Sequence, residues 1–352
     1  MAKPSIHIKA PVRIDLSGGT IDLWPLYLLF KNARTINIGI NLFAEAQAEP
    51  IKEDEITLKS IDQGKEITIY PNDLYSDRLD VPPSLIIHYR LLQYFHRSYP
   101  EMPFSLKLTS IAKSPAGAGL GGSSSLNIAL TSALYCWVHQ KQAIDIEADG
   151  RTIIEIARDV EAGILNGPAG LQDYFGALYG GLQEITWLPH WHVSKQLDKD
   201  RAEEISNRLL LFYSGQSRNS GINNWEVYQS VLNQERKMVN RFENIIQATD
   251  DLSQALDKKN WKKVGEAIEK EWHFRKQLSK GITTSKIEKA FQKAKELGAS
   301  AAKICGAGGG GCFFIYFEEN NPELKEKVAE SLKALELEHL PFEMAKCGLK
   351  ES

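Results

Sequence analysis

Paired cysteines are missing from this sequence. Its 352 residues contain four cysteines, and no two of them form a C-x-x-C pair. One of them, Cys136, lies inside an apolar run with helical character. Free cysteines are among the residue types most often found in protein interiors, so we expect reduced thiols packed in the core.

An excess of either charge is also missing. The chain has 42 basic and 45 acidic residues, for a formal net charge of −3. The whole chain therefore produces no positive field that would attract nucleic acid or anionic lipid, although a local basic patch remains open. The apolar runs fall far short of the ~20 residues that span a membrane, and the N-terminal stretch lacks the apolar segment of a secretory signal. We expect a cytoplasmic protein with neither nucleic acid nor a membrane as partner.

What the chain does contain is the balance of a globular protein. Charged residues make up 25% and hydrophobic residues 43% of the sequence, without repeats or low-complexity tracts. The length suits about two domains of roughly 150 residues each. Prolines, tryptophans and charges gather in residues 186–200, which we take as the boundary. The expected domains are residues 1–195 and 196–352, in a monomer or a homodimer.

Hydrophobic periodicity predicts a mixture of strands and helices. Apolar residues alternate from Thr35 to Ala46, which is typical of a strand with one buried face. Pro82 and Pro83 favour the start of a helix that runs to His96. The expected strands are residues 35–46, 56–58, 67–70, 104–109, 177–185, 208–213, 300–304, 312–317 and 341–345, and the expected helices are 82–96, 126–138, 151–165 and 323–335, with long charged helices before residue 297. Strands that look antiparallel, mixed with helices, predict an α+β fold rather than a doubly wound sheet.

A glycine-rich loop, Pro115 to Ser125, lies between a predicted strand and a predicted helix. A phosphate site needs several backbone N–H groups that converge on one anion, which requires the close approach that glycine permits. A helix that starts near Ser123 would add its free N–H groups and the positive end of its dipole. The expected nucleotide-binding residues are Gly117, Ala118, Gly119, Leu120, Gly121, Gly122, Ser123, Ser124 and Ser125.

Other interpretations of this loop are weaker or remain open. No Gly-Lys-Ser/Thr follows, so the loop is not a P-loop. Its glycines are not followed by the acidic residue, about twenty positions on, that accompanies the G-x-G-x-x-G motif of dinucleotide-binding proteins. A flexible turn capped by serine is the remaining structural alternative.

Two acidic residues twelve positions apart are candidates for a site. Glu161 lies in line with Ile153 and Ala157 at four-residue spacing, so its carboxylate falls on an apolar stripe and needs a metal or a basic partner. Asp173 follows a glycine-flanked turn that would aim it into a cleft. A structural ion pair for Glu161 and a helix cap for Asp173 are the alternatives.

Two further segments carry polar residues and glycines. Near the N-terminus a predicted strand ends at Arg13, and a Gly-Gly turn and Asp22 follow. Arg13 could stabilise the charge on a transferring phosphoryl group, and Asp22 could accept hydrogen bonds from substrate hydroxyls. The alternatives are structural: a surface ion pair of Arg13 with Asp15, a helix-capping role for Asp22, and a place in the core for Trp24. Glycines and Ala307 make up residues 306–311 between two predicted strands. This run suggests a second backbone packed against it, with a tight sheet turn as the alternative.

With these segments in this order, the sequence resembles the GHMP superfamily of galactokinase, homoserine kinase, mevalonate kinase and phosphomevalonate kinase. The family's Pro-x-x-x-Gly-Leu-Gly-Ser-Ser motif matches Pro115 to Ser123, with Gly122 in place of the first serine. Ala169 replaces the usual serine or cysteine between the two acidic positions. The resemblance implies an N-terminal α+β domain like domain 2 of ribosomal protein S5 and a ferredoxin-like C-terminal domain, with ATP and substrate in the cleft between them.

The resemblance also implies roles for individual residues. Asp173 and Arg13 match the catalytic aspartate and the transition-state arginine, and Glu161 matches the glutamate that binds Mg²⁺. Ser123 or Ser124 would supply the hydroxyl on the Mg²⁺ side. The substrate would be bound by Gly19, Thr20 and Asp22.

The implied substrate is a sugar or a sugar phosphate. The Glu-His of galactokinases is replaced by Gly19-Thr20-Ile21, which argues against galactose. The pairs Gly18-Gly19 and Gln172-Asp173 and the segment 209–218 look like the bacterial heptose 7-phosphate kinases, and Arg218 would meet a substrate phosphate unless it forms a surface ion pair. A kinase of a non-sugar alcohol such as mevalonate or homoserine, and a catalytically silent nucleotide or sugar sensor, are the alternatives.

Overall fold

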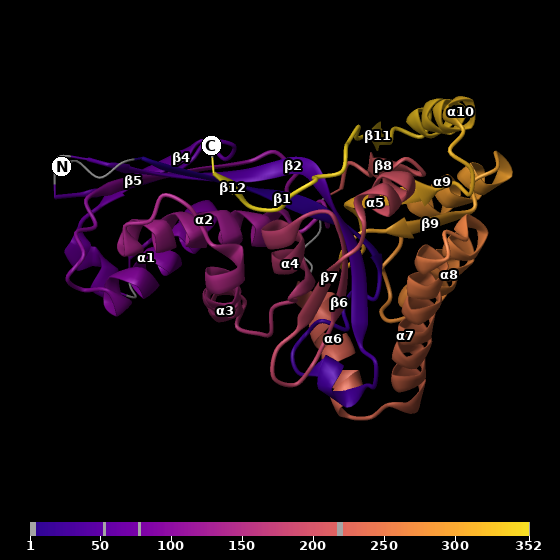
Figure 1. The fold of residues 1–352 in the computed structure, drawn as a ribbon, viewed down its shortest axis with the longest axis horizontal. Coiled ribbons are helices and arrows are strands. Elements are labelled where there is room, and N and C mark those ends of the chain that lie inside the picture. Colours follow the sequence, from indigo (N-terminus) through magenta and orange to yellow (C-terminus); the bar gives the residue numbers. More distant parts are fainter. Residues whose placement is uncertain (1–4, 52–53, 77–78, 217–220, 352) are drawn as a thin grey trace.

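Two β-sheets occupy opposite halves of an elongated molecule (Figure 1). The structure, a computed structural model, describes residues 5–51, 54–76, 79–216 and 221–351. The first sheet has the order β12-β1-β2-β5-β3-β4, with β6 paired to β2 and β7 to β6. Its strands are β1 (Ile6–Ser17), β2 (Arg34–Pro50), β3 (Ile56–Ser60), β4 (Lys65–Ile69), β5 (Leu106–Ala112), β6 (Leu182–Thr186), β7 (Val193–Gln196) and β12 (Lys350–Glu351).

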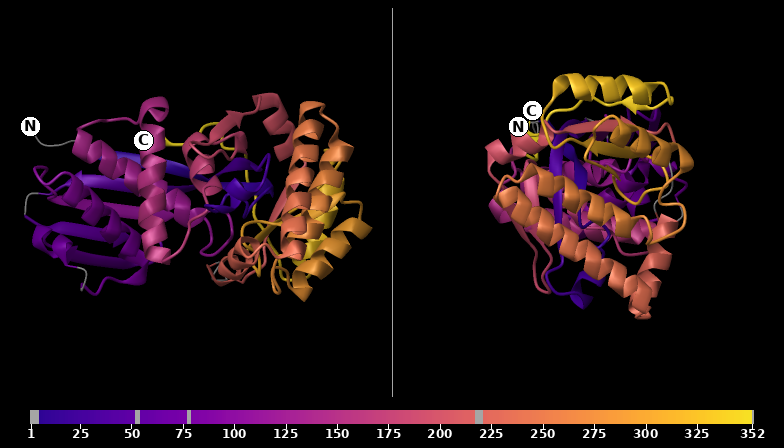
Figure 2. Two further views of the ribbon diagram at one scale, coloured as in Figure 1. Left: turned by 90° about the horizontal axis from the view of Figure 1, so that it is seen from below. Right: turned by 90° about the vertical axis from the view of Figure 1, so that its right-hand side faces the viewer.

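Four helices cover one face of this sheet (Figure 2). They are α1 (Ile86–Ser98), α2 (Gly122–His139), α3 (Ile146–Leu165) and α4 (Gln172–Tyr179). Helix α2 packs directly on β1 and β2, and it is buried on almost every side because its sequence is apolar around the whole circumference. Its N-terminus therefore lies at a fixed position beside β1.

The second sheet is a four-stranded antiparallel sheet in the order β11-β8-β10-β9. Its strands are β8 (Leu209–Tyr213), β9 (Ala301–Ile304), β10 (Cys312–Tyr316) and β11 (Glu338–His339). The helices of this half are α5 (Lys199–Ser206), α6 (Gly221–Leu232), α7 (Arg236–Asp257), α8 (Trp261–Arg275), α9 (Ser285–Glu296) and α10 (Pro322–Lys333), of which α7 and α8 lie side by side (Figure 2).

The side-chain alternation of β10 explains how the second half is layered. Phe313 and Ile315 belong to one apolar cluster together with residues of α9 and α10. Phe314 and Tyr316 belong to a second cluster together with residues of α7 and α8. Successive residues of a strand point to opposite faces, so one strand of aromatic and branched residues supplies both layers.

The second cluster also joins the two halves of the molecule. It contains Ile36, Ile38 and Ile40 of β2, which are fully buried together with side chains of α7 and α8. The strand predicted for residues 35–46 is therefore confirmed, and the face that carries these isoleucines lies against the second half of the chain. The prediction of a single buried face is wrong, because Thr35 and Asn37 on the opposite face are buried too. Hydrophobic burial thus holds the N-terminal sheet in place relative to the second sheet.

Most predicted elements are confirmed, and several boundaries are wrong. The hairpin of β3 and β4, the strands that flank residues 306–311 and the α+β class are confirmed. The strand predicted for 177–185 is wrong in its first part, because α4 continues to Tyr179 and β6 begins at Leu182. The strand predicted to end at Arg13 continues to Ser17, and the strand predicted for 341–345 is reduced to a single bridge between Ile40 and Met344.

Two helix starts also differ from prediction. Helix α3 begins at Ile146, because Asp145 caps it by accepting hydrogen bonds from the N–H groups of Glu147 and Ala148. The helix predicted from Pro82 opens with a 3-10 turn, Pro83–Leu85, before α1. The boundary predicted at residue 195 falls within β7 and remains a prediction.

Most of the thiols lie in the interior. Cys136, Cys305 and Cys312 are buried and free, as expected, whereas Cys347 is exposed. None of the helices in the described ranges has both the length and the apolar character needed to cross a bilayer.

Ile38→Ala is expected to destabilise the protein by about 2–5 kcal/mol, because it leaves a cavity where the two halves meet. The matched control is Ile61→Ala, whose side chain is 51% exposed and which should change stability by at most about 0.5 kcal/mol. Urea unfolding measures both variants. Equal losses in the two variants would contradict the role given to the shared core.

Candidate active site

The predicted phosphate loop lies between the end of β5 and the start of α2. Gly119 and Gly121 have φ values of 73° and 75°, a left-handed conformation that glycine adopts without strain. Gly121 is the N-cap residue of α2 and no side chain caps this helix, so the serine-capped turn is ruled out. The N–H groups of the first helical turn are left for an anion, at the positive end of the helix dipole.

The three serines at the start of α2 have different surroundings. Ser123 is exposed on the first turn. Ser124 is buried and its hydroxyl donates to Glu161 Oε2 at 3.2 Å, and the buried Ser125 donates to the carbonyl oxygen of Pro11 at 2.8 Å. The loop is thus tied to β1 and to α3 by hydroxyl groups.

The second glycine run, residues 306–311, packs directly against this loop. A Cβ at Gly306 would lie 2.8 Å from Gly119 Cα, and one at Gly119 would lie 2.6 Å from the carbonyl oxygen of Cys305. The N–H of Cys312 donates to the carbonyl oxygen of Ala118 at 2.6 Å. The two backbones are in contact without side chains between them. This confirms the prediction that a second backbone packs against the run.

Arg13 links the phosphate loop to the predicted catalytic aspartate. Its buried guanidinium donates from Nη1 to the carbonyl oxygen of Gly119 at 2.7 Å and from Nε to Asp173 Oδ1 at 2.8 Å. Nη2 lies 2.6 Å from the same Oδ1. Burial alone would lower the pKa of Arg13, but the carboxylates of Asp173 and Asp15 raise it above the ordinary value. The pairing of Arg13 with Asp15 at the surface is therefore wrong.

Asp173 lies next to the phosphate loop. It is in the first turn of α4 rather than in a turn before it, and a Cβ at Gly121 would lie 3.0 Å from Asp173 Cγ. About a fifth of its side chain remains exposed. The structure brings the loop, Arg13 and Asp173 together.

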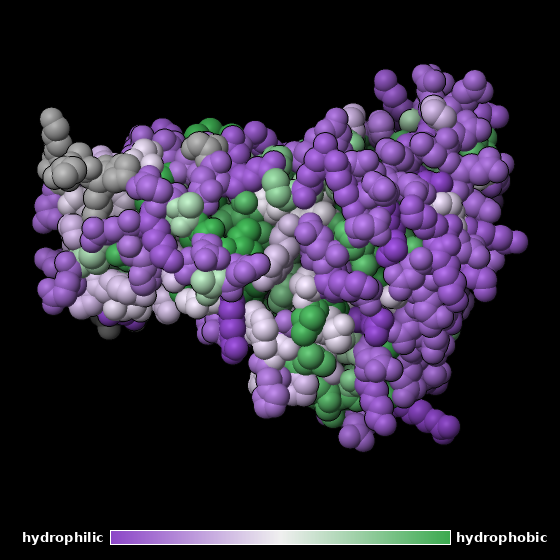
Figure 3. Space-filling view, viewed as in Figure 1, coloured by the Kyte–Doolittle hydropathy of each residue, from purple (hydrophilic) through white to green (hydrophobic). Residues whose placement is uncertain are grey.

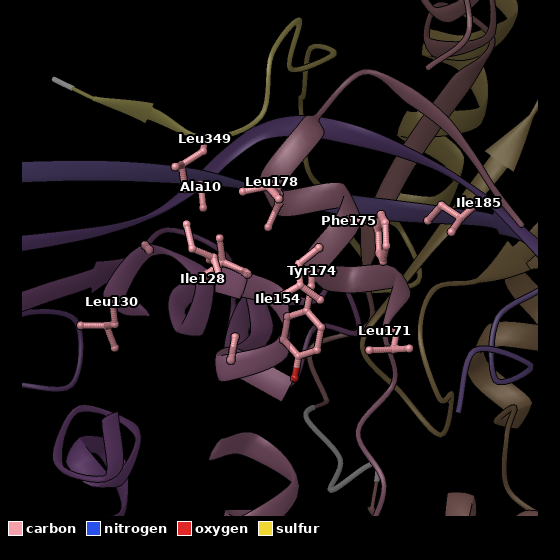
Figure 4. Close-up of a cluster of buried hydrophobic side chains, with 14 of the residues drawn as sticks. Ala10, Ile128, Leu130, Ile154, Leu171, Tyr174, Phe175, Leu178, Ile185 and Leu349 are labelled. Carbon is pink, nitrogen blue, oxygen red and sulfur yellow. The ribbon is translucent and has the colours of Figure 1, made fainter. Parts of the chain in front are cut away.

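Glu161 also reaches this site, through two hydroxyl groups. Oε2 accepts hydrogen bonds from Ser124 and from Tyr174, whose side chain extends from the buried cluster in Figure 4. Among the described residues, no basic side chain forms an ion pair with Glu161, so the structural salt bridge is not found. Burial is the main cause of the raised pKa of Glu161, and the charge of Asp173 adds to it. Sequence reasoning missed Tyr174, because a tyrosine next to an aspartate stands out neither in spacing nor in composition.

The geometry fits a metal ion that a nucleotide would bring with it. Within the described ranges, no group of three or more His, Cys, Asp and Glu side chains is arranged to hold a metal ion. Mg²⁺ bound with phosphates keeps water ligands and takes only one or two groups from the protein. Glu161 with Ser124, or with the exposed Ser123, matches that requirement.

The predicted substrate segment runs along the same side of the site. Asp22 is 2% exposed and its Oδ2 accepts a hydrogen bond from the N–H of Gln172 at 3.0 Å, so it joins the start of α4 immediately before Asp173. Thr20 has a φ of 72°, in the turn that follows Gly19. Asp22 thus binds the N-terminus of α4 from a distant segment. The capping role given as an alternative for Asp22 is therefore found at this helix.

The segment after Asp22 combines buried residues, such as Leu23 and Leu26, with exposed apolar side chains. Trp24 is 56% exposed, so its placement in the core is wrong. Leu28 and Leu29 of the following 3-10 turn, Leu26–Leu29, are exposed as well. In Figure 3 apolar residues gather at the lower end of the molecule, where α6 lies in Figure 1. Arg218 lies outside the described residues.

The electrostatic environment of Asp22 disfavours its charge. Burial raises the pKa of Asp22 to about 6, and the nearby carboxylates of Asp173 and Asp15 contribute, while the Gln172 N–H acts in the opposite direction. Asp22 is therefore a carboxyl group that titrates close to neutral pH. Such perturbed groups cluster at functional sites.

An anion-binding loop, an arginine bound to a carboxylate, and a second buried carboxyl beside them define an enzyme of the phosphotransferase class. Two family models match the chain: the GHMP kinases N terminal domain over residues 87–181 and the GHMP kinases C terminal domain over residues 252–334. Together they span about half of the sequence. The chain belongs to the GHMP kinase superfamily, as the motifs indicated.

Relatives match over almost the full length. The chain is similar to D-glycero-alpha-D-manno-heptose 7-phosphate kinase of Campylobacter jejuni, at 22% identity over 98% of both chains. Among solved structures, it is similar to a D-glycero-D-manno-heptose 1-phosphate kinase from Bacteroides thetaiotaomicron, with a TM-score of 0.75, 21% identity and coverage of 99% and 98%. Mevalonate kinase of Methanococcus jannaschii matches with a TM-score of 0.76, 20% identity and coverage of 97% and 99%. These structures establish the two-domain GHMP kinase fold.

Gly306→Ala is expected to destabilise the protein by about 1–3 kcal/mol more than Gly64→Ala does, because its Cβ would collide with the phosphate loop. Both glycines have a left-handed φ, 65° and 59°, so both variants carry the same backbone strain, but a Cβ at Gly64 meets nothing within 4 Å. Urea unfolding of the two variants measures the difference. Equal losses of unfolding free energy in the two variants would show that the two glycine runs are not in tight contact.

Asp22→Asn is expected to change how stability depends on pH. The carboxyl loses its proton near its ordinary value of 3.8 in the unfolded chain, but only near pH 6 in the folded protein. Between these values the folded state binds more protons, so this group makes stability fall as the pH rises, by about 1.4 kcal/mol per pH unit. Urea unfolding from about pH 4 to about pH 7 should show wild type losing stability relative to the variant. Parallel curves would contradict the assignment.

Proposed function

We propose that this protein is an ATP-dependent kinase that transfers the γ-phosphoryl group to a hydroxyl of a sugar or a sugar phosphate. The observation that carries the proposal is the position of Arg13, which binds both the Gly119 carbonyl of the phosphate loop and the carboxylate of Asp173. A phosphate on the loop amides would therefore lie beside a cation and a carboxylate. Phosphoryl transfer needs little more than positioning and charge stabilisation from the protein.

The donor would bind at the start of α2. The loop from Gly117 to Ser125 offers backbone N–H groups and the positive end of a long buried helix to the phosphates. Mg²⁺, when bound, would neutralise phosphate charge beside Glu161 and a serine hydroxyl. Tyr174 and Ser124 hold the Glu161 carboxylate in place through its Oε2 atom.

The acceptor hydroxyl would meet Asp173. Arg13 directs two N–H groups to Oδ1, so we assign Oδ2 to the acceptor hydroxyl. Asp173 would take the proton from this hydroxyl, or at least orient it, at Oδ2. Arg13 would stabilise the charge that develops on the transferring group.

The sugar class is supported by relatives and by the acceptor segment. The Campylobacter jejuni relative is named a heptose 7-phosphate kinase, and it matches over nearly the whole chain. Asp22, with Gly19 and Thr20, would accept hydrogen bonds from acceptor hydroxyls. A place in carbohydrate metabolism in the cytoplasm, with the protein as a monomer or a homodimer, belongs to the same proposal.

A kinase of a non-sugar alcohol is the second candidate. The similarity to mevalonate kinase of Methanococcus jannaschii favours it. Arg13 stands where the resemblance places a lysine in mevalonate kinases, which favours the sugar class instead. A catalytically silent sensor would have no need of the pair that the buried Arg13 forms with Asp173, because burying the guanidinium costs desolvation.

Asp173→Asn is expected to lower kcat by about 10² to 10⁴, because the amide cannot take a proton from the acceptor hydroxyl. ADP release over a panel of sugars, sugar phosphates, mevalonate and homoserine measures turnover and identifies the acceptor class. Asp159→Asn, which changes an exposed aspartate on α3, is the matched control and should retain full activity. Wild-type turnover by Asp173→Asn would contradict the mechanism, and turnover of mevalonate alone would contradict the sugar class.

A further inference from the structure

Four buried charged residues form a cluster where the two halves of the molecule meet. Asp15 comes from β1, Glu271 and Arg275 from α8, and Lys303 from β9, and none is more than 2% exposed. Lys303 Nζ lies 3.1 Å from Asp15 Oδ2 and 3.2 Å from Glu271 Oε1. Arg275 lies 3.6 Å from each of the same two carboxylates. Two positive and two negative charges balance, but they lie in the interior.

Stability alone does not account for such a cluster. Moving charges out of water costs several kcal/mol per ion, and well-packed apolar residues are often as stable or more stable in their place. Burial raises the pKa of Glu271, and the neighbouring cations offset this only in part. We therefore look for the role of the cluster in the contacts that it makes with neighbouring segments.

Those contacts reach both sides of the proposed site. On the acceptor side, the N–H of Gly18 donates to Glu271 Oε1 at 3.3 Å, and a Cβ at Gly19 would lie 2.7 Å from Arg275 Nη1. On the donor side, Arg275 Nη2 donates to the carbonyl oxygen of Gly306 at 2.8 Å. Gly306 is the residue that packs against the phosphate loop at Gly119. One guanidinium thus touches the segment that leads to Asp22 and the segment that supports the loop.

We propose that Arg275 is a positioning residue that sets the acceptor segment, residues 18–22, at a fixed distance from the phosphate loop. The inference rests on the proposed kinase function. Arg275 acts through Gly19 and Gly306 and does not touch the reacting atoms. The carboxylates of Asp15 and Glu271, which also bind Lys303, hold its guanidinium in the required orientation. A misplacement of about 1 Å between reacting groups is enough to cost about 10²-fold in rate.

Arg275→Lys tests this role, because lysine keeps the charge but cannot reach Gly306, Asp15 and Glu271 at once. We expect kcat per ATP-binding site to fall by about 10- to 100-fold, while the affinity for each substrate alone changes by no more than about threefold. The number of ATP-binding sites is taken from the titration stoichiometry. Arg201→Lys, at an arginine that pairs with Asp257 at 2.7 Å on the second half, is the matched control.

Hydrogen exchange supplies a readout that does not depend on activity. Residues 18–22 and 306–311 should exchange faster in Arg275→Lys than in wild type and in Arg201→Lys. If wild type phosphorylates no acceptor, the kinase proposal fails, and the exchange data still decide whether Arg275 holds these segments. Unchanged exchange, or a lower melting temperature with unchanged kcat per site, would overturn the positioning role.

Glu271→Gln is the second variant, which keeps the proposal open to test if Arg275→Lys does not fold. It has the same shape and keeps an oxygen for the N–H of Gly18, but it removes the charge that orients Arg275. The same fall in kcat per site, with retained binding of each substrate, is expected. Wild-type turnover together with wild-type exchange in residues 18–22 would overturn the proposal.

Discussion

The guanidinium of Arg13 connects the phosphate loop to Asp173, the two parts of the site that phosphoryl transfer would need side by side. It lies on β1, next to β2 in the first sheet, and it binds the carbonyl oxygen of Gly119 and the carboxylate of Asp173. A buried guanidinium without partners would be costly, so the phosphate loop and α4 are both held against β1. The separation between the loop amides and Asp173 is consequently fixed by a charge-assisted contact rather than by the conformation of a flexible loop.

The glycines extend this constraint to the second half of the chain. Because Gly119 and Gly306 have no side chains, their backbones touch, and the Cys312 N–H binds the loop at Ala118. The apolar core around Ile38, which both halves share, also holds the two halves together. Arg275 then connects the second glycine run to the acceptor segment. The site is thus assembled from both halves of the sequence, and each half contributes backbone that is rigid because it is packed.

Sequence reasoning reached the fold class, and it picked out residues that the structure brings together, for identifiable reasons. The period-two pattern of β2, the strand, loop and helix order around the glycines, and the spacing of Glu161 and Asp173 are local signals. The contacts that it missed are long-range. Tyr174 binds Glu161 across two helices, and Lys303, in the middle of the apolar strand Ala301–Ile304, finds its carboxylates on β1 and α8. A lysine inside such a strand is a signal of a buried partner, but its identity depends on packing between distant segments.

The structure of the protein with a non-hydrolysable ATP analogue and Mg²⁺ tests the central claim most directly. The account predicts that the phosphates lie on the amides of residues 119–123 and that the terminal phosphate lies within hydrogen-bond distance of Arg13, on the side that Asp173 faces. Phosphates bound away from these amides, or an Arg13 turned away from both Gly119 and Asp173, would contradict it.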